Sequence, residues 1–105
     1  MSDIHYANEK FYNAVDSLCG DGPLKTRIHY AFMSFHPVQA SDFADAELRA
    51  KYEEIRRRLT VVKDGPEDRG YVLNTLDAMS DDEARQLSHL IVELAFNIED
   101  VCARG

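Results

Sequence analysis

The chain has 105 residues, 45% of them hydrophobic, and carries a formal net charge of −7. A chain of this length is close to the common size of one domain and can bury a core without a metal or a disulfide. We therefore expect a single domain over residues 1–105. It contains no stretch of about 18 apolar residues and begins without a basic and then apolar leader. These absences lead us to expect no membrane span, no secretory signal and a cytoplasmic location.

Apolar residues recur at helical spacing near the start of the chain, and no segment alternates like a strand. A first helix is expected over residues 3–19, because Gly20 follows at the position that favours a left-handed helix end. A second helix is expected over residues 23–35, opening on a proline in its first turn. It should end before Pro37, since the residue before a proline avoids the helical conformation.

The middle of the chain predicts a loop and two further helices. Residues 38–42 read as the loop, and a third helix over residues 43–63 follows it. A fourth and weaker helix is expected over residues 67–79. Gly70 weakens this helix because an interior glycine costs about 1 kcal/mol relative to alanine.

The last quarter of the chain, residues 80–105, carries the strongest helix signal. Ser80 and Glu83 have the spacing of a capping box, in which each side chain bonds the other residue's backbone amide. An apolar stripe at helical spacing follows: Leu87, Leu90, Ile91, Leu94, Ala95, Ile98, Val101 and Cys102. The predicted fold class is therefore all-α, a single small bundle of four to five helices that run mostly antiparallel.

The core of this bundle is predicted from the apolar stripes of the individual helices. It comprises Phe11, Val15, Leu18, Ile28, Phe32, Phe35, Leu48, Tyr52, Ile55, Leu59, Leu76, Leu87, Ile91, Leu94 and Ile98.

Three consecutive arginines at 56–58 form the one basic run, within a segment where acids and bases balance. Acidic residues precede basic ones by four positions, the favoured orientation for ion pairs along a helix. We therefore interpret the run as a solvated helix face and expect no nucleic-acid partner. The expected pairs are Asp45–Arg49, Glu47–Lys51, Glu53–Arg57 and Glu54–Arg58.

The sequence contains no recognisable motif for catalysis or cofactor binding. Cys19 and Cys102 are expected to be small buried residues near helix ends, where the dipole raises a thiol pKa. His29, Met33 and His36 would line one side of the second helix and could in principle ligate a metal. The proline after His36 spoils that geometry, so we predict no metal. Because no catalytic or cofactor motif is present, we also predict no enzyme activity and no cofactor.

A second apolar face is the remaining signal. Tyr30 and Met33 project away from the main stripe of the second helix, as Val92 and Phe96 do on the fifth. Such residues are enriched at interface cores, so these four form the candidate interface. The alternative is that the short fourth helix and the loop over residues 36–43, with its Phe43, cover this surface.

The predicted function is a non-enzymatic protein-interaction module, most simply a self-associating homodimer. Two alternatives stay open. The acidic first and last thirds of the chain could bind a basic protein surface, as an inhibitor or adaptor does. A pocket between helices near His29 could instead make the protein a sensor of a small ligand or metal.

Overall fold

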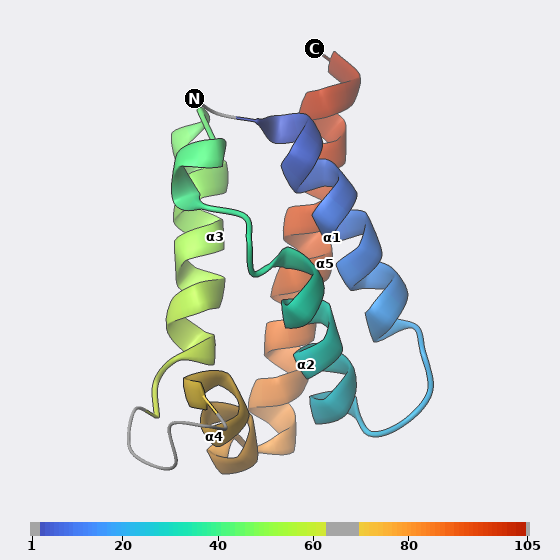
Figure 1. The fold of residues 1–105 in the computed structure, drawn as a ribbon, viewed down its shortest axis with the longest axis vertical. Coiled ribbons are helices and arrows are strands. Elements are labelled where there is room, and N and C mark those ends of the chain that lie inside the picture. Colours follow the sequence, from blue (N-terminus) through green and yellow to red (C-terminus); the bar gives the residue numbers. More distant parts are fainter. Residues whose placement is uncertain (1–2, 63–69, 105) are drawn as a thin grey trace.

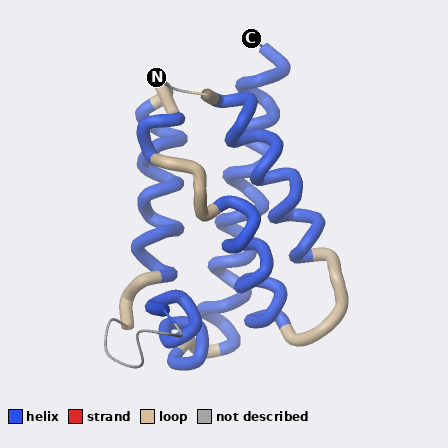
Figure 2. The backbone as a smooth tube through the Cα atoms, viewed as in Figure 1, coloured by secondary structure: helices blue, strands red, loops and turns tan. Residues whose placement is uncertain are grey.

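The computed structural model describes residues 3–62 and 70–104, and every regular element within them is helical. Figure 1 shows the arrangement, and Figure 2 shows that only loops and turns join the helices. This confirms the predicted all-α fold class. In chain order the elements are α1 (Ile4–Leu18), α2 (Leu24–Phe35), the 3-10 helix η1 (Ala40–Asp42), α3 (Ala46–Leu59), α4 (Gly70–Ala78) and α5 (Asp81–Arg104).

The longest helix, α5, lies between α1 and α3 and contacts both. In Figure 1, α1 descends on the right, α2 rises in front of α5, α3 descends on the left, and α5 rises behind. Helices α1 and α5 therefore run antiparallel, as do α1 and α2, and α3 and α5. The short α4 lies at the foot of the bundle against α2 and α3.

Local signals fix the starts of the first and last helices. The Asp3 carboxylate accepts a hydrogen bond from the Tyr6 amide at 3.0 Å, which satisfies one of the unpaired donors of the first turn. At α5 the Ser80 hydroxyl accepts from the Glu83 amide at 3.1 Å, and the Glu83 carboxylate accepts from the Ser80 amide at 3.4 Å. The predicted capping box is confirmed.

The third helix starts three residues later than predicted, at Ala46 rather than Phe43, and ends at Leu59, short of the predicted residue 63. Asp45 is its N-cap, because the Asp45 carboxylate accepts from the Glu47 amide at 2.8 Å and from the Leu48 amide at 3.2 Å. Phe43 stands outside the helix and is only 1% exposed. Phe43 is apolar because it is buried from a loop, and helical periodicity alone does not distinguish such a residue from the first residue of a helix.

The fourth helix starts at Gly70, and residues 63 and 67–69 of the predicted helices lie outside the described residues. Gly70 has φ +79°, a left-handed conformation that glycine adopts without steric cost. The glycine therefore opens the helix instead of weakening its interior. The second helix likewise starts one residue later than expected, with Pro23 as its N-cap.

Most of the predicted core is buried, but Val15 and Phe32 are only partly buried. Phe11 and Phe35 stack with ring centroids 4.8 Å apart, joining α1 to α2. The core also contains residues that the predicted core did not include: Ala7, Ala14, Ala31, Val38, Phe43, Met79, Ala84 and Ala95. Five of these are alanines, whose small side chains permit close helix approach.

Candidate functional site

Three of the four candidate interface residues are exposed. The exposed fractions are 57% for Tyr30, 54% for Met33 and 63% for Phe96, whereas Val92 is half-buried. Neither α4 nor the loop over residues 36–43 covers the three exposed side chains. Phe43 instead packs inside the bundle, with its ring centroid 5.2 Å from that of Tyr52.

The structure places the four residues on two separate surfaces. Helix α2 lies in front of α5 in Figure 1, and both turn their buried sides toward the same core. The outward sides of two helices that flank one core point in opposite directions. Tyr30 and Met33 therefore face away on the α2 side, and Val92 and Phe96 on the α5 side. One partner helix cannot cover both pairs.

Tyr12 on α1 is an exposed aromatic residue that the sequence reasoning missed, and at 75% it is the most exposed large hydrophobic residue described. Ile4, Asn8 and Tyr12 form one row at spacing i, i+4 along α1. The Cys102 thiol of α5 lies 3.6 Å from the Ile4 carbonyl oxygen that accepts its hydrogen bond. The start of α1 therefore adjoins the end of α5, and we infer that this row lies on the α5 side of α1.

Tyr12 is level with the middle of α5. From the contact between Ile4 and Cys102, eight residues forward along α1 reach Tyr12, and eight backward along the antiparallel α5 reach Leu94. Val92 and Phe96 lie two residues to either side of that level. Tyr12, Val92 and Phe96 thus share one outward surface, which we call the α1–α5 face. Its signal in the sequence is the Phe11–Tyr12 pair, because neighbouring helical residues cannot both face the core.

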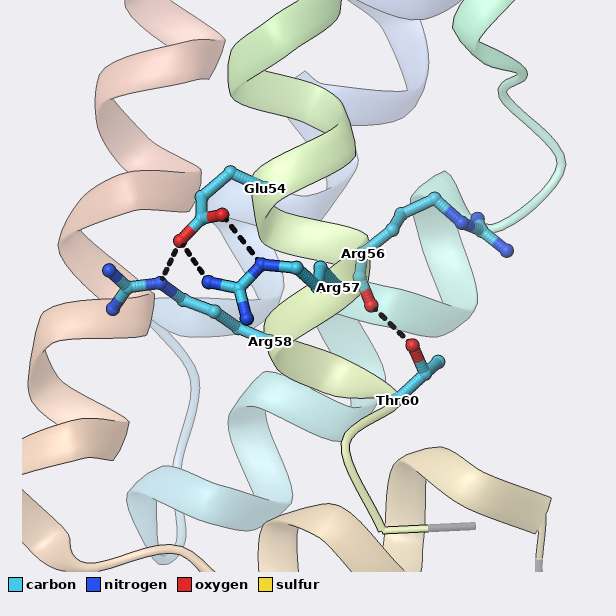
Figure 3. A network of polar contacts seen from close by, with 5 residues as sticks. All are labelled: Glu54, Arg56, Arg57, Arg58 and Thr60. Atoms are coloured by element: carbon cyan, nitrogen blue, oxygen red, sulfur yellow. Dashed lines mark hydrogen bonds and ion pairs between the residues drawn. The ribbon is translucent and has the colours of Figure 1, made fainter.

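The arginine run is largely neutralised within the chain (Figure 3). The two Glu54 carboxylate oxygens accept from Arg57 at 2.9 and 2.7 Å, and one of them accepts from Arg58 at 2.7 Å. These hydrogen bonds lower the Glu54 pKa from 4.5 to about 2. The expected Glu54–Arg58 pair is confirmed, whereas Arg57 bonds Glu54 instead of the expected Glu53.

Arg56 points to the opposite side of α3 from Glu54 (Figure 3). It donates to the His36 carbonyl at 3.1 Å and to the Tyr52 hydroxyl at 3.0 Å. The Tyr52 hydroxyl in turn donates to the Val38 carbonyl. Burial raises the Tyr52 pKa, which keeps this hydroxyl protonated as a donor. Arg56 and Tyr52 therefore tie the loop after α2 to α3.

The two remaining expected ion pairs are replaced by other contacts. Arg49 donates to the Phe43 carbonyl at 3.0 Å, while Asp45 is occupied as the helix cap. Lys51 reaches across to α5, where it donates to Glu93 at 3.2 Å and to Asn97 at 2.7 Å. The four-residue spacing predicts only partners on the same helix, so it does not predict the contact of Lys51 with α5.

A groove of about 220 Å³ lies between α3 and α5, on the flank of α5 that faces away from α1. Ile55 and Leu90 contribute apolar surface, and Lys51, Glu54 and Glu93 contribute charged groups that are already paired with one another or with Arg57 and Arg58. The groove therefore offers a bound molecule few free polar groups.

The candidate metal ligands do not converge. His29 is half-buried, whereas Met33 and His36 are exposed, and His36 lies just beyond the end of α2. Within residues 3–62 and 70–104, no group of three or more histidine, cysteine or acidic side chains could hold a metal ion.

The two cysteines are free thiols in different surroundings. Cys19 is exposed, so the expectation that it is buried is wrong: it follows the last residue of α1, where the chain leaves the bundle. Cys102 is half-buried, and burial together with nearby Glu99 raises its thiol pKa. A raised thiol pKa lowers the reactive thiolate fraction.

Among the helices that the structure describes, none combines the length and apolar character needed to cross a bilayer. Comparison with models of protein families, with curated proteins and with solved structures finds no match for the chain.

Proposed function

We propose that this protein is a non-enzymatic interaction module that self-associates as a homodimer through the α1–α5 face. The observation that carries the proposal is the exposure of two aromatic side chains at the same level of adjacent helices, Tyr12 at 75% and Phe96 at 63%. Half-buried Val92 adjoins them on α5. Aromatic residues at the centre of a surface are typical anchors of protein interfaces.

The size of the α1–α5 face supports a stable dimer. Helix α5 has 24 residues, which corresponds to a length of about 36 Å. Helix α1 has 15 residues and is about 22 Å long, so the two helices, each about 10 Å wide, together present roughly 580 Å². Two copies would then bury roughly 1,160 Å², just above the roughly 1,000 Å² that a biological interface should exceed. Helix α2 has only 12 residues and is about 18 Å long, so with the adjacent α1 that side presents roughly 400 Å² by the same reasoning. The surface around Tyr30 and Met33 is too small to hold a dimer alone.

The net charge of −7 predicts how salt should act on this dimer. Two copies of a chain with the same net charge repel each other, and added salt screens that repulsion. Self-association should therefore strengthen as ionic strength rises. The same negative charge, with Arg57 and Arg58 already paired to Glu54, argues against a nucleic-acid partner.

Sedimentation equilibrium at several protein concentrations and two ionic strengths tests the proposal. The expected result is a monomer–dimer equilibrium whose dissociation constant falls as salt is added. A monomer at millimolar concentration in high salt would overturn the proposal. If the protein is instead an acidic adaptor, its binding to a basic partner should weaken as salt is added, because salt screens the attraction between opposite charges.

The proposal also places the protein in the cytoplasm. The chain has only two cysteines, whereas small secreted domains are typically dense in disulfides.

A further inference from the structure

An open hollow of about 720 Å³ lies between α3 and the segment over residues 36–40. Its lining includes Glu53, Arg56 and Thr60 from α3, and His36, Pro37 and Ala40 from the facing segment. The hollow therefore places an acidic and a basic side chain of one helix on a single concave surface. It is separate from the α1–α5 face, because α5 lies between α1 and α3.

The Arg56 guanidinium is held by contacts that leave one of its edges free. Its Nη1 atom makes both of its hydrogen bonds, to the His36 carbonyl at 3.1 Å and to the Tyr52 hydroxyl at 3.0 Å. The guanidinium carbon also lies 5.6 Å from the centre of the Phe32 ring and 5.7 Å from that of the Tyr52 ring, within the range of cation–π attraction. Among the described residues, the Arg56 Nε and Nη2 donors have no acceptor.

The neighbouring Arg57 shows which chemical group this edge accepts. Its Nε and Nη2 atoms donate to the two Glu54 carboxylate oxygens at 2.9 and 2.7 Å, the two-pronged contact typical of arginine with a carboxylate. Arg56 has the same pair of donors at the hollow, yet no carboxylate of the described residues lies within ion-pair distance of it. This edge is therefore suited to a carboxylate from outside the chain.

Glu53 supplies a charge of opposite sign next to Arg56. It precedes Arg56 by three positions, so the two side chains start about 5–6 Å apart on one side of α3. Glu53 is exposed, and its expected partner Arg57 is bound to Glu54 instead. Within the part of the chain that the structure describes, no cation lies at ion-pair distance from Glu53. The hollow thus holds an anionic and a cationic group that are neighbours but are both unpaired.

We propose that this hollow binds a free α-amino acid, whose carboxylate contacts Arg56 and whose ammonium group contacts Glu53. An α-amino acid carries both groups on one carbon atom, so one small molecule can reach neighbouring charges of opposite sign. It has no net charge, so the net charge of −7 does not repel it as it repels a simple anion such as acetate. Pro37 and Ala40 add apolar surface, which favours an apolar side chain such as that of leucine. This binding is independent of the proposed self-association.

A nuclear magnetic resonance titration of the isotope-labelled protein with leucine tests the proposal. We expect shifts of the Arg56 Nε–Hε resonance and of the backbone amides around the hollow. The dissociation constant should be roughly millimolar, because the two ion pairs form in a partly exposed site. Salt at about 0.15 M screens the net charge of the chain, so that local contacts determine the binding.

Two analogues of leucine test the two charged contacts separately. N-acetyl-leucine lacks the ammonium group and leucinamide lacks the carboxylate, so each should bind about fivefold more weakly than leucine. The analogues also resemble the two ends of a peptide chain. N-acetyl-leucine that binds as tightly as leucine would show that the site takes any carboxylate, such as a peptide C-terminus, and would overturn the assignment to a free amino acid.

Matched variants assign the contacts to residues. Arg56→Lys keeps the positive charge but loses the two-pronged donor edge, so it should weaken leucine binding about tenfold. Glu53→Gln should remove the preference for leucine over N-acetyl-leucine. Arg57→Gln is the control, because it removes a neighbouring charge whose donor edge is occupied by Glu54, and it should change the affinity by less than about twofold.

The exposed position of Glu53 keeps the test decisive. Its side chain has no ion-pair partner in the described residues, so Glu53→Gln should fold like the parent even if Arg56→Lys loosens the loop after α2. A preference for leucine that persists in Glu53→Gln would contradict the ammonium contact. Leucine that shifts no resonance around the hollow at tens of millimolar would overturn the proposal. An Arg57→Gln variant that binds as weakly as Arg56→Lys would do the same, because binding would then follow the local positive charge alone.

Discussion

Replacing Phe96 by alanine should weaken the dimer strongly while leaving the folded monomer almost unchanged. A phenylalanine side chain has about 200 Å² of surface, so an exposed fraction of 63% leaves about 125 Å² available for burial in an interface. At about 25 cal/mol per Å², that area corresponds to about 3 kcal/mol per copy and about 6 kcal/mol per dimer. If the dimer buries half of this available area, removing the ring costs about 3 kcal/mol per dimer, and the dissociation constant should rise about 100-fold.

The assay compares dissociation constants from sedimentation equilibrium with unfolding free energies measured by denaturant titration. Phe96→Ala should change the free energy of unfolding of the monomer by no more than about 0.5 kcal/mol, as is usual for exposed positions. Tyr30→Ala is the matched control, because it removes an aromatic ring of 57% exposure from the opposite surface. A dissociation constant that Phe96→Ala leaves unchanged, or that Tyr30→Ala raises as much, would refute the reasoning.

Three further predictions concern the fold. Leu94→Ala should lower the free energy of unfolding by about 2–5 kcal/mol, since Leu94 is 0% exposed; parental stability in a denaturant titration would contradict its place in the core. Ser80→Ala should cost about 1 kcal/mol by losing the helix cap, whereas the threonine variant should retain most of it in the same titration. Glu54→Gln should melt below the parent at pH 7. Because folding lowers the Glu54 pKa from 4.5 to about 2, this carboxylate stabilises the fold fully above about pH 4.5 and progressively less toward pH 2. The melting difference should therefore close over that range, and a difference independent of pH would refute the assigned partners.

Sequence reasoning predicted the helices well where the signals were local. The capping box at Ser80 and the proline after His36 determine helix ends through the backbone of a few neighbouring residues. The start of α3 was misplaced because Phe43 is apolar for a tertiary reason. It fills the core next to Tyr52 from a loop, and helical periodicity cannot distinguish that role from a helical one.

The candidate surface was only partly predictable for a related reason. A helical wheel shows that Tyr30 and Phe96 point away from the core, but not on which side of the bundle their helices lie. The four candidate residues were therefore grouped although the structure separates α2 from α5 across the core. Tyr12 was overlooked because its neighbour Phe11 accounted for the aromatic character of that turn. The contact between Ile4 and Cys102, which places Tyr12 beside α5, is set by tertiary packing alone.

The most direct test of the self-association claim is an isotope-filtered nuclear Overhauser experiment on a mixture of labelled and unlabelled chains. Only contacts between different copies give signals in such a sample. The proposed dimer predicts cross-peaks from the Phe96 ring of one copy to side chains of the α1–α5 face of the other, which contains Tyr12, Val92 and Phe96. A dimer whose cross-peaks instead involve Tyr30 and Met33, or a sample with no intermolecular cross-peaks at millimolar concentration, would contradict it.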